Sequence, residues 1–573
     1  MVLAGAVCIP ISAALTLWLP RLIGEALDKI GEIASGDGSD PTTVGGTLAT
    51  TCLLFAGVAT LDALFRFFGR RLIINASRFV EEDLKSSLMN HISRLRASWF
   101  DRAQTGDLIS RFTQDVELLR FVVGPFILHG GMAILIVPAS IWLMATLSPT
   151  LTLAAGSIFG LLVVSLALLL PHLLSHSRAV QESIALISQR SNESFSGIRV
   201  LMNFARAREE TETIRQMSED YLGHNMKLTR LRSLLNLSIH CSRDLVTLAI
   251  LVIGGLEALE GSITIGQLFE FLLYLGIIVW PLTVTGWLIA LLPRAFAAAE
   301  RIEEVFQQEP EPTEGREVDL VGAIEARNLT FSYGDEERAA LTNLSFTLPA
   351  GQKLGIVGPI GSGKSTLISL LLRLYDPPRG SIFIDGYDIT DLAPSSLRKL
   401  FAVAPQDPFL FSDTISSNIS FSSDEMDGKD IDKAVRASAL DQDIEDFPQG
   451  LGSIVGERGL TLSGGQKQRV SLARALAAKR PALILDDTIS AVDQETELRI
   501  LKHLEHVRGK RTLVVTAHRL SAVADADLII VLDHGTAAEM GTHTELIALD
   551  GYYAQAWRLQ REEAALDGPG ENL

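Results

Sequence analysis

The feature that most constrains this chain is a series of long uncharged stretches before about residue 300. Met1 to Pro20, Pro41 to Leu61 and Phe121 to Ser177 contain no Asp, Glu, Lys or Arg. A helix needs about 20 predominantly apolar residues to cross a bilayer. The third stretch is therefore long enough for two spans, with a turn at Ser148-Pro149-Thr150.

Two further stretches bring the predicted number of spans to six. Phe271 to Pro293 is uncharged, while Ser233–Ser242 and Leu245–Leu256 flank the pair Arg243-Asp244, so the fifth span is the least regular. Met1–Pro20 lacks the basic start and the small-residue cleavage site of a signal peptide, so it is also expected to be a span.

The distribution of basic residues orients these spans. Arg66–Arg120 and Arg178–Arg243 each carry ten Lys or Arg, whereas Gly24–Thr42 carries only Lys29 and Glu257–Glu270 carries none. Positively charged loops stay on the cytoplasmic side. We therefore expect a multi-pass protein of the cell (inner or plasma) membrane, with both chain ends in the cytoplasm.

The two basic segments are too long to be simple loops. Apolar residues recur at helical spacing in the first of them, as in Leu84, Leu88 and Ile92. We expect the spanning helices to continue into the cytoplasm and to reverse near Ser98–Gly106 and Ala205–Glu210. Solvated loops are the alternative, but structureless loops of this length are uncommon in folded domains.

Some ionisable residues fall at membrane depth, where they are candidates for functional contacts. Asp62 and Arg66 are four residues apart on one helix face and are expected to pair. His129, Glu270 and the Arg243-Asp244 pair are the others, and pairing or proximity to the interface explains them equally well.

Composition narrows the classes of function. Acidic residues outnumber basic ones 68 to 50, and the sequence pI is about 5.1. This balance argues against nucleic acid as the main partner, because nucleic-acid binders present a basic face. The three cysteines, Cys8, Cys52 and Cys241, lie in apolar stretches, so neither a disulfide framework nor a zinc site is predicted.

A change in composition and in hydrophobic pattern marks a second domain. The polar segment Glu309–Gly315 contains two prolines and interrupts the helical pattern, as a linker does. After it, short β-rich runs alternate with helical stretches, which is typical of an α/β domain with a mostly parallel sheet.

The sharpest motif is a phosphate-binding loop, G-P-I-G-S-G-K-S at Gly358–Ser365. It follows the strand-like run Lys353–Val357 and opens a helical run, as the motif requires. Its backbone N–H groups can converge on phosphate oxygens, Lys364 can reach the β- and γ-phosphates, and the Ser365 hydroxyl can bind Mg²⁺. The predicted ATP-binding residues here are Gly358, Pro359, Ile360, Gly361, Ser362, Gly363, Lys364, Ser365 and Thr366.

Two further elements complete the nucleotide-binding pattern. Pro481–Asp486 is predicted to be a buried strand that ends in a carboxylate, with Asp486 placed to hold Mg²⁺. The run S-G-G-Q can cap a helix whose start exposes backbone N–H groups, a second anion site in the same domain. A sandwich of two such domains explains this second anion site, because the helix start of one domain then covers the nucleotide bound by the other. The residues of this start are Ser463, Gly464, Gly465 and Gln466.

In this order, the three motifs resemble those of the ATP-binding cassette family. With six spans before the cassette, the chain is similar over nearly its full length to a type I exporter half-transporter. The resemblance implies an α-helical polytopic membrane domain with long cytoplasmic extensions, fused to an α/β P-loop NTPase domain. The expected limits are 1–305 for the transmembrane domain, 306–322 for a linker, 323–557 for the ATP-binding domain and 558–573 for a C-terminal tail.

The resemblance also implies roles for single residues. Tyr333 matches the aromatic residue that stacks on adenine. Gln406 matches the glutamine that contacts Mg²⁺ and the membrane-domain interface, and His518 matches the switch histidine at the γ-phosphate. Two residues match segments that couple the cassettes to the membrane domain. Glu457 matches a segment that contacts the membrane helices, and Asp493 matches a loop that crosses the dimer interface.

One position departs from the family pattern. The residue after Asp486, usually a Glu that polarises the attacking water, is Asp487 here. Its side chain is one methylene shorter, and misplacement by about 1 Å can lower a rate roughly 10²-fold. We therefore expect this chain's own site to bind ATP with Mg²⁺ but to hydrolyse it slowly, with Asp487, His518 and Gln406 as its catalytic residues.

The expected function is ATP-driven efflux of small amphipathic, drug- or lipid-like molecules by an exporter dimer in membrane lipid. An intact S-G-G-Q motif beside a weak site resembles the heterodimeric multidrug-type exporters of the MdlA type. It implies a different half-transporter, with Glu at the position of Asp487, as the partner. A homodimeric lipid or peptide exporter and a nucleotide-gated channel are the alternatives, whereas the six spans oppose a soluble cassette ATPase.

Overall fold

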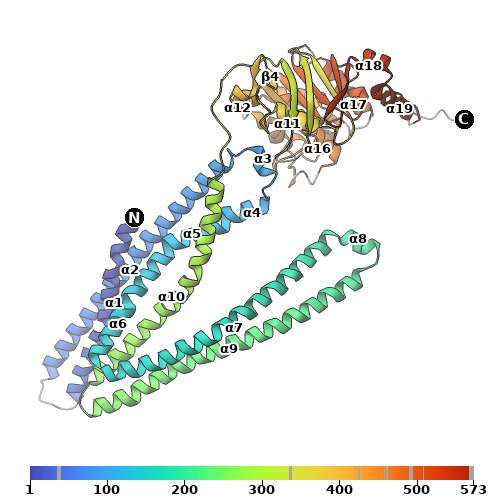
Figure 1. Ribbon diagram of the computed structural model, residues 1–573. Coiled ribbons are helices and arrows are strands. Elements are labelled where there is room, and N and C mark those ends of the chain that lie inside the picture. Colours follow the sequence, from blue (N-terminus) through green and yellow to red (C-terminus); the bar gives the residue numbers. More distant parts are fainter. Residues whose placement is uncertain are drawn as a thin grey trace. The chain divides into compact units, whose positions relative to one another are not determined.

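The chain folds into two compact units, shown in the computed structural model of Figure 1. The first comprises Met1–Asn90 and Thr105–Gln307, and the second comprises His91–Gln104 and Gln308–Leu573. The short segment His91–Gln104 therefore lies between two membrane helices in the sequence but packs with the second unit. The structure describes residues 1–34, 41–334, 338–423, 426–456, 459, 462–489, 494–506 and 509–566.

The first unit is built from helices. Among the residues that the structure describes, six stretches are long and apolar enough to cross a membrane, so the predicted number of spans is confirmed. The helices are α1 (Val2–Ala34), α2 (Pro41–Ile92), α4 (Thr105–Ser110), α5 (Val116–Phe121), α6 (Ile127–Leu147), α7 (Pro149–Ser196), α8 (Ile198–Asn203), α9 (Ala207–Leu259) and α10 (Ile265–Phe306).

The third span contains two π-helical turns. They are η1 (Arg111–Asp115) and η2 (Val122–Phe126), on either side of α5. Proline lacks a backbone N–H and disturbs regular helical hydrogen bonding, which accounts for the irregularity at Pro125 in η2. In η1, the buried Asp115 forms an ion pair with Arg301 of α10, so this turn is fixed to the last span.

α7 and α9 form a long antiparallel hairpin joined by α8, and Figure 1 shows it diverging from the other helices of the unit. The hairpin is anchored near its α6 end by a hydrophobic cluster in which Leu151 and Ile250 pack with Phe271 and Tyr274. Along the rest of α7, large apolar side chains such as Leu161 and Leu168 are exposed. This surface needs lipid or another chain to cover it.

Two carboxylates, a buried one on α2 and a half-buried one on α1, tie α1 to its neighbours. Asp62 of α2 accepts a hydrogen bond from Ser12 at 2.6 Å and pairs with Arg66 at 2.5 Å, which confirms the pair predicted from the spacing. Asp28 caps the start of α10, since its carboxylate accepts the Gly266 N–H at 2.7 Å and the Thr264 hydroxyl at 2.6 Å.

The second unit contains two sheets. The larger has the order β10-β9-β3-β8-β7-β6 and is parallel except for β10, and the smaller has the order β2-β1-β4-β5 and is antiparallel. The strands are β1 (Ile324–Phe331), β2 (Leu341–Leu348), β3 (Lys353–Val357), β4 (Ile382–Ile384), β5 (Tyr387–Asp388), β6 (Phe401–Ala404), β7 (Ala482–Asp486), β8 (Thr512–Thr516), β9 (Leu528–Asp533) and β10 (Thr536–Gly541).

Alternate residues of the parallel strands build two separate cores. Val514 of β8 packs with the side chains of the small sheet and α11, whereas Leu513 and Val515 pack with the opposite set of helices. Parallel strands buried on both faces are therefore apolar throughout. The helices of this unit are α3 (Ala97–Phe100), α11 (Lys364–Leu371), α12 (Pro394–Leu400), α13 (Ile415–Ile419), α14 (Gly428–Ala437), α15 (Asp441–Asp446), α16 (Gly464–Ala477), α17 (Gln494–Glu505), α18 (His543–Leu549) and α19 (Tyr552–Leu566).

Candidate functional site

The candidate site lies at the carboxyl ends of β3, β7 and β8, which are neighbours in the parallel sheet. β3 leads into the phosphate-binding loop, β7 ends at Asp486, and His518 follows β8 by two residues. Ligands of parallel α/β sheets bind at this edge because the loops that follow the strands gather there. The fold thus brings together motifs that are far apart in the sequence.

Three glycines of the phosphate-binding loop have positive φ angles that other residues rarely adopt: Gly358 (151°), Gly361 (78°) and Gly363 (103°). Their backbone turns the loop into the start of α11, whose N–H groups and dipole favour a bound phosphate. Lys364 Nζ donates hydrogen bonds to the Gly358 and Pro359 carbonyl oxygens at 2.8 and 2.9 Å. The side chain is therefore already positioned inside the loop.

Burial lowers the pKa of Lys364, and the carboxylates of Asp487 and Asp486 oppose that shift. Burial also raises the pKa of Asp486, although a hydrogen bond from Thr516 acts in the opposite direction. Both shifts have the same cause, because charged groups are held in a poorly solvated pocket. Polyanionic phosphates and a cation would compensate these two charges.

Thr516 holds the two carboxylate residues at the end of β7. Its hydroxyl donates to Asp486 Oδ1 at 2.6 Å and accepts the Asp487 N–H at 2.9 Å. The sequence analysis did not identify Thr516, whose importance follows from its position opposite Asp486 in the β7–β8 register. Only the pairing of the two strands reveals it.

Asp487 lies between the other two predicted catalytic residues. Its Oδ2 atom accepts a hydrogen bond from Gln406 Nε2 at 3.5 Å and lies 3.9 Å from His518 Nε2. The Asp487 side chain is buried, while Gln406 and His518 are exposed. The structure thus brings Asp487, His518 and Gln406 to one place, with the carboxylate deepest in the site.

The oxygen donors at this edge fit a magnesium ion. The Ser365 hydroxyl, the Gln406 amide oxygen and the Asp486 carboxylate are the hard ligands that Mg²⁺ prefers. Burial raises the pKa of Asp486, so a cation bound there would favour its ionised carboxylate. These three residues would hold the ion, which would neutralise charge on the phosphates.

Tyr333 is fixed beside the phosphate-binding helix. Its hydroxyl donates to Thr366 Oγ1 at 3.0 Å, and its ring lies 4.9 Å from the Tyr375 ring and 5.2 Å from the Phe331 ring, both edge to face. An aromatic ring held at this distance from the loop suits stacking on a nucleobase. Tyr375 was not among the residues predicted from the sequence.

The second predicted anion site is the start of α16. Ser463 accepts the Gln466 N–H at 3.3 Å, and the Gln466 side chain accepts the Ser463 N–H at 2.9 Å, so the predicted cap is present as a reciprocal capping box. Ser463 and Gly464 are exposed. Within the described part of the chain, these first residues of the helix are therefore accessible to a ligand or to another chain.

Two predicted coupling residues fall outside the described part of the chain. They are Glu457 and Asp493, and their roles stay predictions. The neighbouring Ser463–Gln466 and Asp486–Asp487 are described in full.

Comparison with known proteins decides the family. The family described as "ABC transporter transmembrane region" matches residues 2–282, and the family described as "ABC transporter" matches residues 341–490. The chain is 34% identical over 565 residues, which cover 98% of it and 94% of its relative, to the "Multidrug resistance-like ATP-binding protein MdlA" of Escherichia coli. The chain belongs to the ABC transporter family.

Two further likenesses support the exporter architecture of this ABC transporter. It is 33% identical to the "ATP-dependent lipid A-core flippase" of Photobacterium profundum, over 83% of this chain and 82% of the relative. The solved "Structure of a bacterial Atm1-family ABC exporter with ATP bound" superposes with a TM-score of 0.76 at 27% identity, covering 98% of both chains.

These findings establish the general activity. The chain is an ATPase-coupled transmembrane transporter of the exporter type, a multi-pass membrane protein whose ATP-binding domain is cytoplasmic. It carries one membrane domain and one cassette, and half-transporters of this kind act as dimers in membrane lipid. The resemblance stated from the sequence is therefore confirmed at the level of family and fold.

Proposed function

We propose that this chain is the weakly hydrolysing half of an asymmetric exporter dimer, and that the dimer moves small amphipathic, drug- or lipid-like molecules across the membrane. The observation that carries the proposal is the position of Asp487. It occupies the place of the water-polarising carboxylate, between Gln406 and His518, with a side chain one methylene shorter than glutamate.

The short side chain explains slow hydrolysis at this chain's own ATP site. Asp487 is buried and its carboxylate contacts Gln406, and with one methylene fewer than glutamate it would reach less far toward an attacking water. Loss of about 1 Å of reach costs a general base much of its rate. Lys364 and Tyr333 are unaffected, so this site binds and holds ATP.

The start of α16 serves the other ATP site. Ser463, Gly464 and the helix dipole present partial positive charge to the triphosphate bound by the partner's phosphate-binding loop. ATP closes the two cassettes only to the extent that it binds the closed state more tightly than the open one. A partner with glutamate at the position of Asp487 would supply the faster hydrolysis that resets the cycle.

The cytoplasmic tip of the α7–α9 hairpin supports a dimeric arrangement. Phe195 and Phe204 at this tip are each 74% exposed. The tip is braced, because Arg190 donates two hydrogen bonds of 2.6 Å to Glu210, which also accepts from Ser194 at 2.7 Å. A rigid, exposed apolar tip of this kind is suited to bind another protein surface.

The cassette carries a surface that matches such a tip. A cavity of about 380 Å³ is lined mostly by apolar side chains, among them Ile415, Phe447 and Ile454. We assign this cavity to the α8 tip of the partner, so that closure of the cassettes pulls on the partner's membrane helices.

The substrate class rests on the membrane unit and on the relatives. The spans expose large apolar side chains, including Trp142 and Trp280, which suits amphipathic molecules. One relative is named for multidrug resistance and another for lipid A-core flipping. A homodimeric lipid exporter is therefore the second candidate.

Reconstitution tests the proposal. The chain and its partner half-transporter are placed in liposomes, and ATP-dependent transport of a fluorescent amphiphile is measured. We expect transport to be lost with Lys364→Ala and retained with Asp487→Ala. Complete loss with Asp487→Ala, or brisk ATP turnover by this chain purified alone, would overturn the unequal division of hydrolysis.

A further inference from the structure

The turn that carries His518 is held by α19. Gln560 of this helix donates from Nε2 to the His518 carbonyl oxygen at 2.8 Å, and its Oε1 atom accepts the Leu520 N–H at 2.8 Å. Arg519, between the two bonded residues, is extended (φ −90°, ψ 121°), so both backbone groups face the same side, as they do in a β-strand. One side-chain amide therefore uses both its donor and its acceptor to fix the turn.

α19 is itself anchored on the cassette. Glu539 of β10 accepts the Tyr553 N–H at 3.2 Å near the helix start, and the fully buried Tyr553 packs into the same hydrophobic core as Leu520. Trp557 packs against this core as well. Tyr553, Trp557 and Gln560 are four and three residues apart, which places them on one face of the helix. The packing that anchors α19 thus also brings Gln560 to the turn.

A second helix, α17, holds side chains of the same turn. The Glu497 carboxylate, which belongs to a residue only 3% exposed, accepts hydrogen bonds from Arg519 Nη1 at 2.6 Å and from the Ser521 hydroxyl at 2.5 Å. Glu497 thus binds the side chains that follow His518, whereas Gln560 binds the backbone of His518 itself.

The backbone matters because the His518 ring lies too far from Asp487 to be oriented by it. The 3.9 Å between His518 Nε2 and Asp487 Oδ2 exceeds the length of a hydrogen bond. The residue before the histidine is fixed, since the Ala517 N–H donates to the Ile356 carbonyl at 3.2 Å. The direction of the ring therefore follows from the backbone, and Gln560 holds that backbone immediately after the Cα atom of His518.

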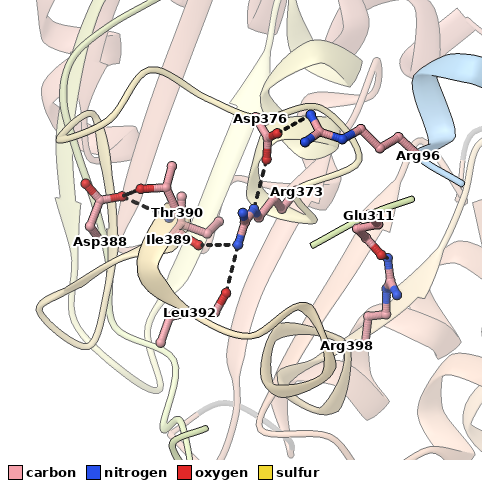
Figure 2. A network of polar contacts seen from close by, with 9 residues as sticks. All are labelled: Arg96, Glu311, Arg373, Asp376, Asp388, Ile389, Thr390, Leu392 and Arg398. Atoms are coloured by element: carbon pink, nitrogen blue, oxygen red, sulfur yellow. Dashed lines mark hydrogen bonds and ion pairs between the residues drawn. The ribbon is translucent and has the colours of Figure 1, made fainter. Parts of the chain in front are cut away.

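The phosphate-binding helix is fixed by separate contacts. Beyond its end, the Arg373 guanidinium donates to the Leu392 carbonyl at 2.7 Å and to the Ile389 carbonyl at 3.2 Å (Figure 2). Lys364 is bonded within its own loop. None of these contacts involves α19, so a change at Gln560 would leave the groups that bind ATP in place.

We propose that Gln560 is a positioning residue for ATP hydrolysis, which holds the His518 backbone so that the imidazole ring points at the γ-phosphate. The end of the chain, expected from the sequence to be a tail beyond residue 557, then contributes to the ATP site. This inference rests on the proposed role of His518 and extends it to a residue 42 positions away.

Single-turnover hydrolysis tests the inference in the full-length dimer in lipid nanodiscs. The partner's ATP site is inactivated by substitution of its own glutamate, so that radiolabelled ATP is cleaved only at this chain's site. Gln560→Met keeps a long side chain of similar helix propensity but removes both hydrogen bonds. We expect the rate of cleavage to fall about tenfold, because a displaced catalytic group loses much of its effect, while the Kd for ATP changes less than about twofold.

The matched control lies on the same helix. Gln555 is exposed on α19, and Gln555→Met should leave both the rate of cleavage and the Kd unchanged. A wild-type rate in Gln560→Met would overturn the proposal, and so would a fall of the same size in Gln555→Met.

A double-mutant cycle separates positioning from a general loss of structure. His518→Ala alone is expected to lower the rate of cleavage, and Gln560→Met should cause no further loss in that background, because the group that it positions is gone. A helix that merely stabilised the cassette would lower the rate equally in both backgrounds. Additive losses would therefore contradict the role of Gln560 as a positioning residue.

Hydrogen exchange gives a measurement that needs no hydrolysis. Peptides that contain the Leu520 amide should exchange roughly tenfold faster in Gln560→Met than in wild type or in Gln555→Met, because this amide loses its acceptor. Unchanged exchange would mean that the bond does not hold the turn, and would overturn the inference.

The outcomes separate this inference from the proposed function. If His518→Ala leaves cleavage unchanged, the assigned role of His518 fails, and the inference fails with it. If His518→Ala lowers cleavage and Gln560→Met does not, the proposed function stands and only the present inference fails.

Discussion

The carboxylate of Asp487 lies 3.9 Å from His518 Nε2, on a residue whose backbone has a positive φ of 47°. Aspartate is among the few residue types that tolerate this left-handed conformation without glycine. The backbone N–H is fixed by Thr516, so the side chain starts from a rigid position. Its reach toward the nucleotide is therefore set by side-chain length.

Lengthening this side chain should raise hydrolysis. Asp487→Glu is expected to increase ATP turnover at this chain's site about 10- to 100-fold, because the carboxylate recovers roughly 1 Å of reach. Turnover is measured in a dimer whose partner site is inactivated by substitution of its own glutamate. Asp487→Asn, which keeps the length and removes the charge, is the control and should show no increase. An equal rate for all three forms would mean that Asp487 does not limit hydrolysis.

Removing the lysine of the phosphate-binding loop should weaken nucleotide binding. Lys364→Ala is expected to raise the Kd for ATP at this site about 10- to 100-fold, since charge-assisted hydrogen bonds contribute roughly 1.5–3 kcal/mol each. Binding is followed with a fluorescent ATP analogue. Lys399→Ala, on α12 and away from the loop, is the matched control and should leave the Kd unchanged.

The cap of α16 should matter to the other site. Ser463→Ala removes a helix cap worth about 1 kcal/mol and a hydroxyl that, in the proposed dimer, would face the partner's triphosphate. ATP hydrolysis at the partner's site should fall at least about tenfold, while ATP binding at this chain's Lys364 stays unchanged. Ser471→Ala, deeper in the same helix, is the control. A loss of ATP binding at Lys364 with intact hydrolysis by the partner would reverse the assignment.

The exposed tip of the hairpin should be needed for coupling. Phe204→Ser is expected to lower transport per ATP hydrolysed at least about threefold, because it removes an apolar side chain from a small docking surface. Val321→Ser, which removes another exposed apolar side chain, from the cassette, is the control. Cross-linking between cysteines at the tip and in the partner's cassette gives an independent measurement, and its absence in a transporting dimer would contradict the docking.

Close packing of α1 on α10 should make one glycine essential. A Cβ atom at Gly266 would overlap the Gly24 carbonyl oxygen and come within 2.5 Å of Asp28 Cγ. Gly266→Ala is therefore expected to lower the melting temperature, at a cost of about 1–3 kcal/mol. Gly276→Ala in the same helix meets no atom within 4 Å and should be neutral or stabilising. Thermal unfolding in detergent, followed by intrinsic fluorescence, compares the two variants.

The elements that could be predicted from the sequence are those whose cause is local. The uncharged runs predicted the six spans, the run Lys353–Val357 is β3 at the same bounds, and Ser463 caps the predicted helix. Each depends on hydrophobic periodicity, on a glycine pattern or on a cap within a few residues. The departure at Asp487 was visible for the same reason.

Other parts of the site depend on strand order and packing. The position of Thr516 opposite Asp486 follows from the pairing of β7 with β8. The distances that join Asp487 to Gln406 and His518 likewise depend on the folded sheet. The two π-helical turns of the third span were not predicted either. One of them holds Asp115, whose ion pair with Arg301 joins residues far apart in the sequence.

The sequence by itself determined that the chain crosses a membrane six times, carries an ATP-binding cassette and has a shortened carboxylate beside its phosphate site. Only the tertiary structure decided that His91–Gln104 packs with the cassette and that Tyr375 connects Tyr333 to Asp101. The physical reason is the range of the interactions. A motif consists of residues that are neighbours in the sequence. The Tyr375–Asp101 hydrogen bond instead joins side chains 274 positions apart, and only the packing of distant elements brings them together.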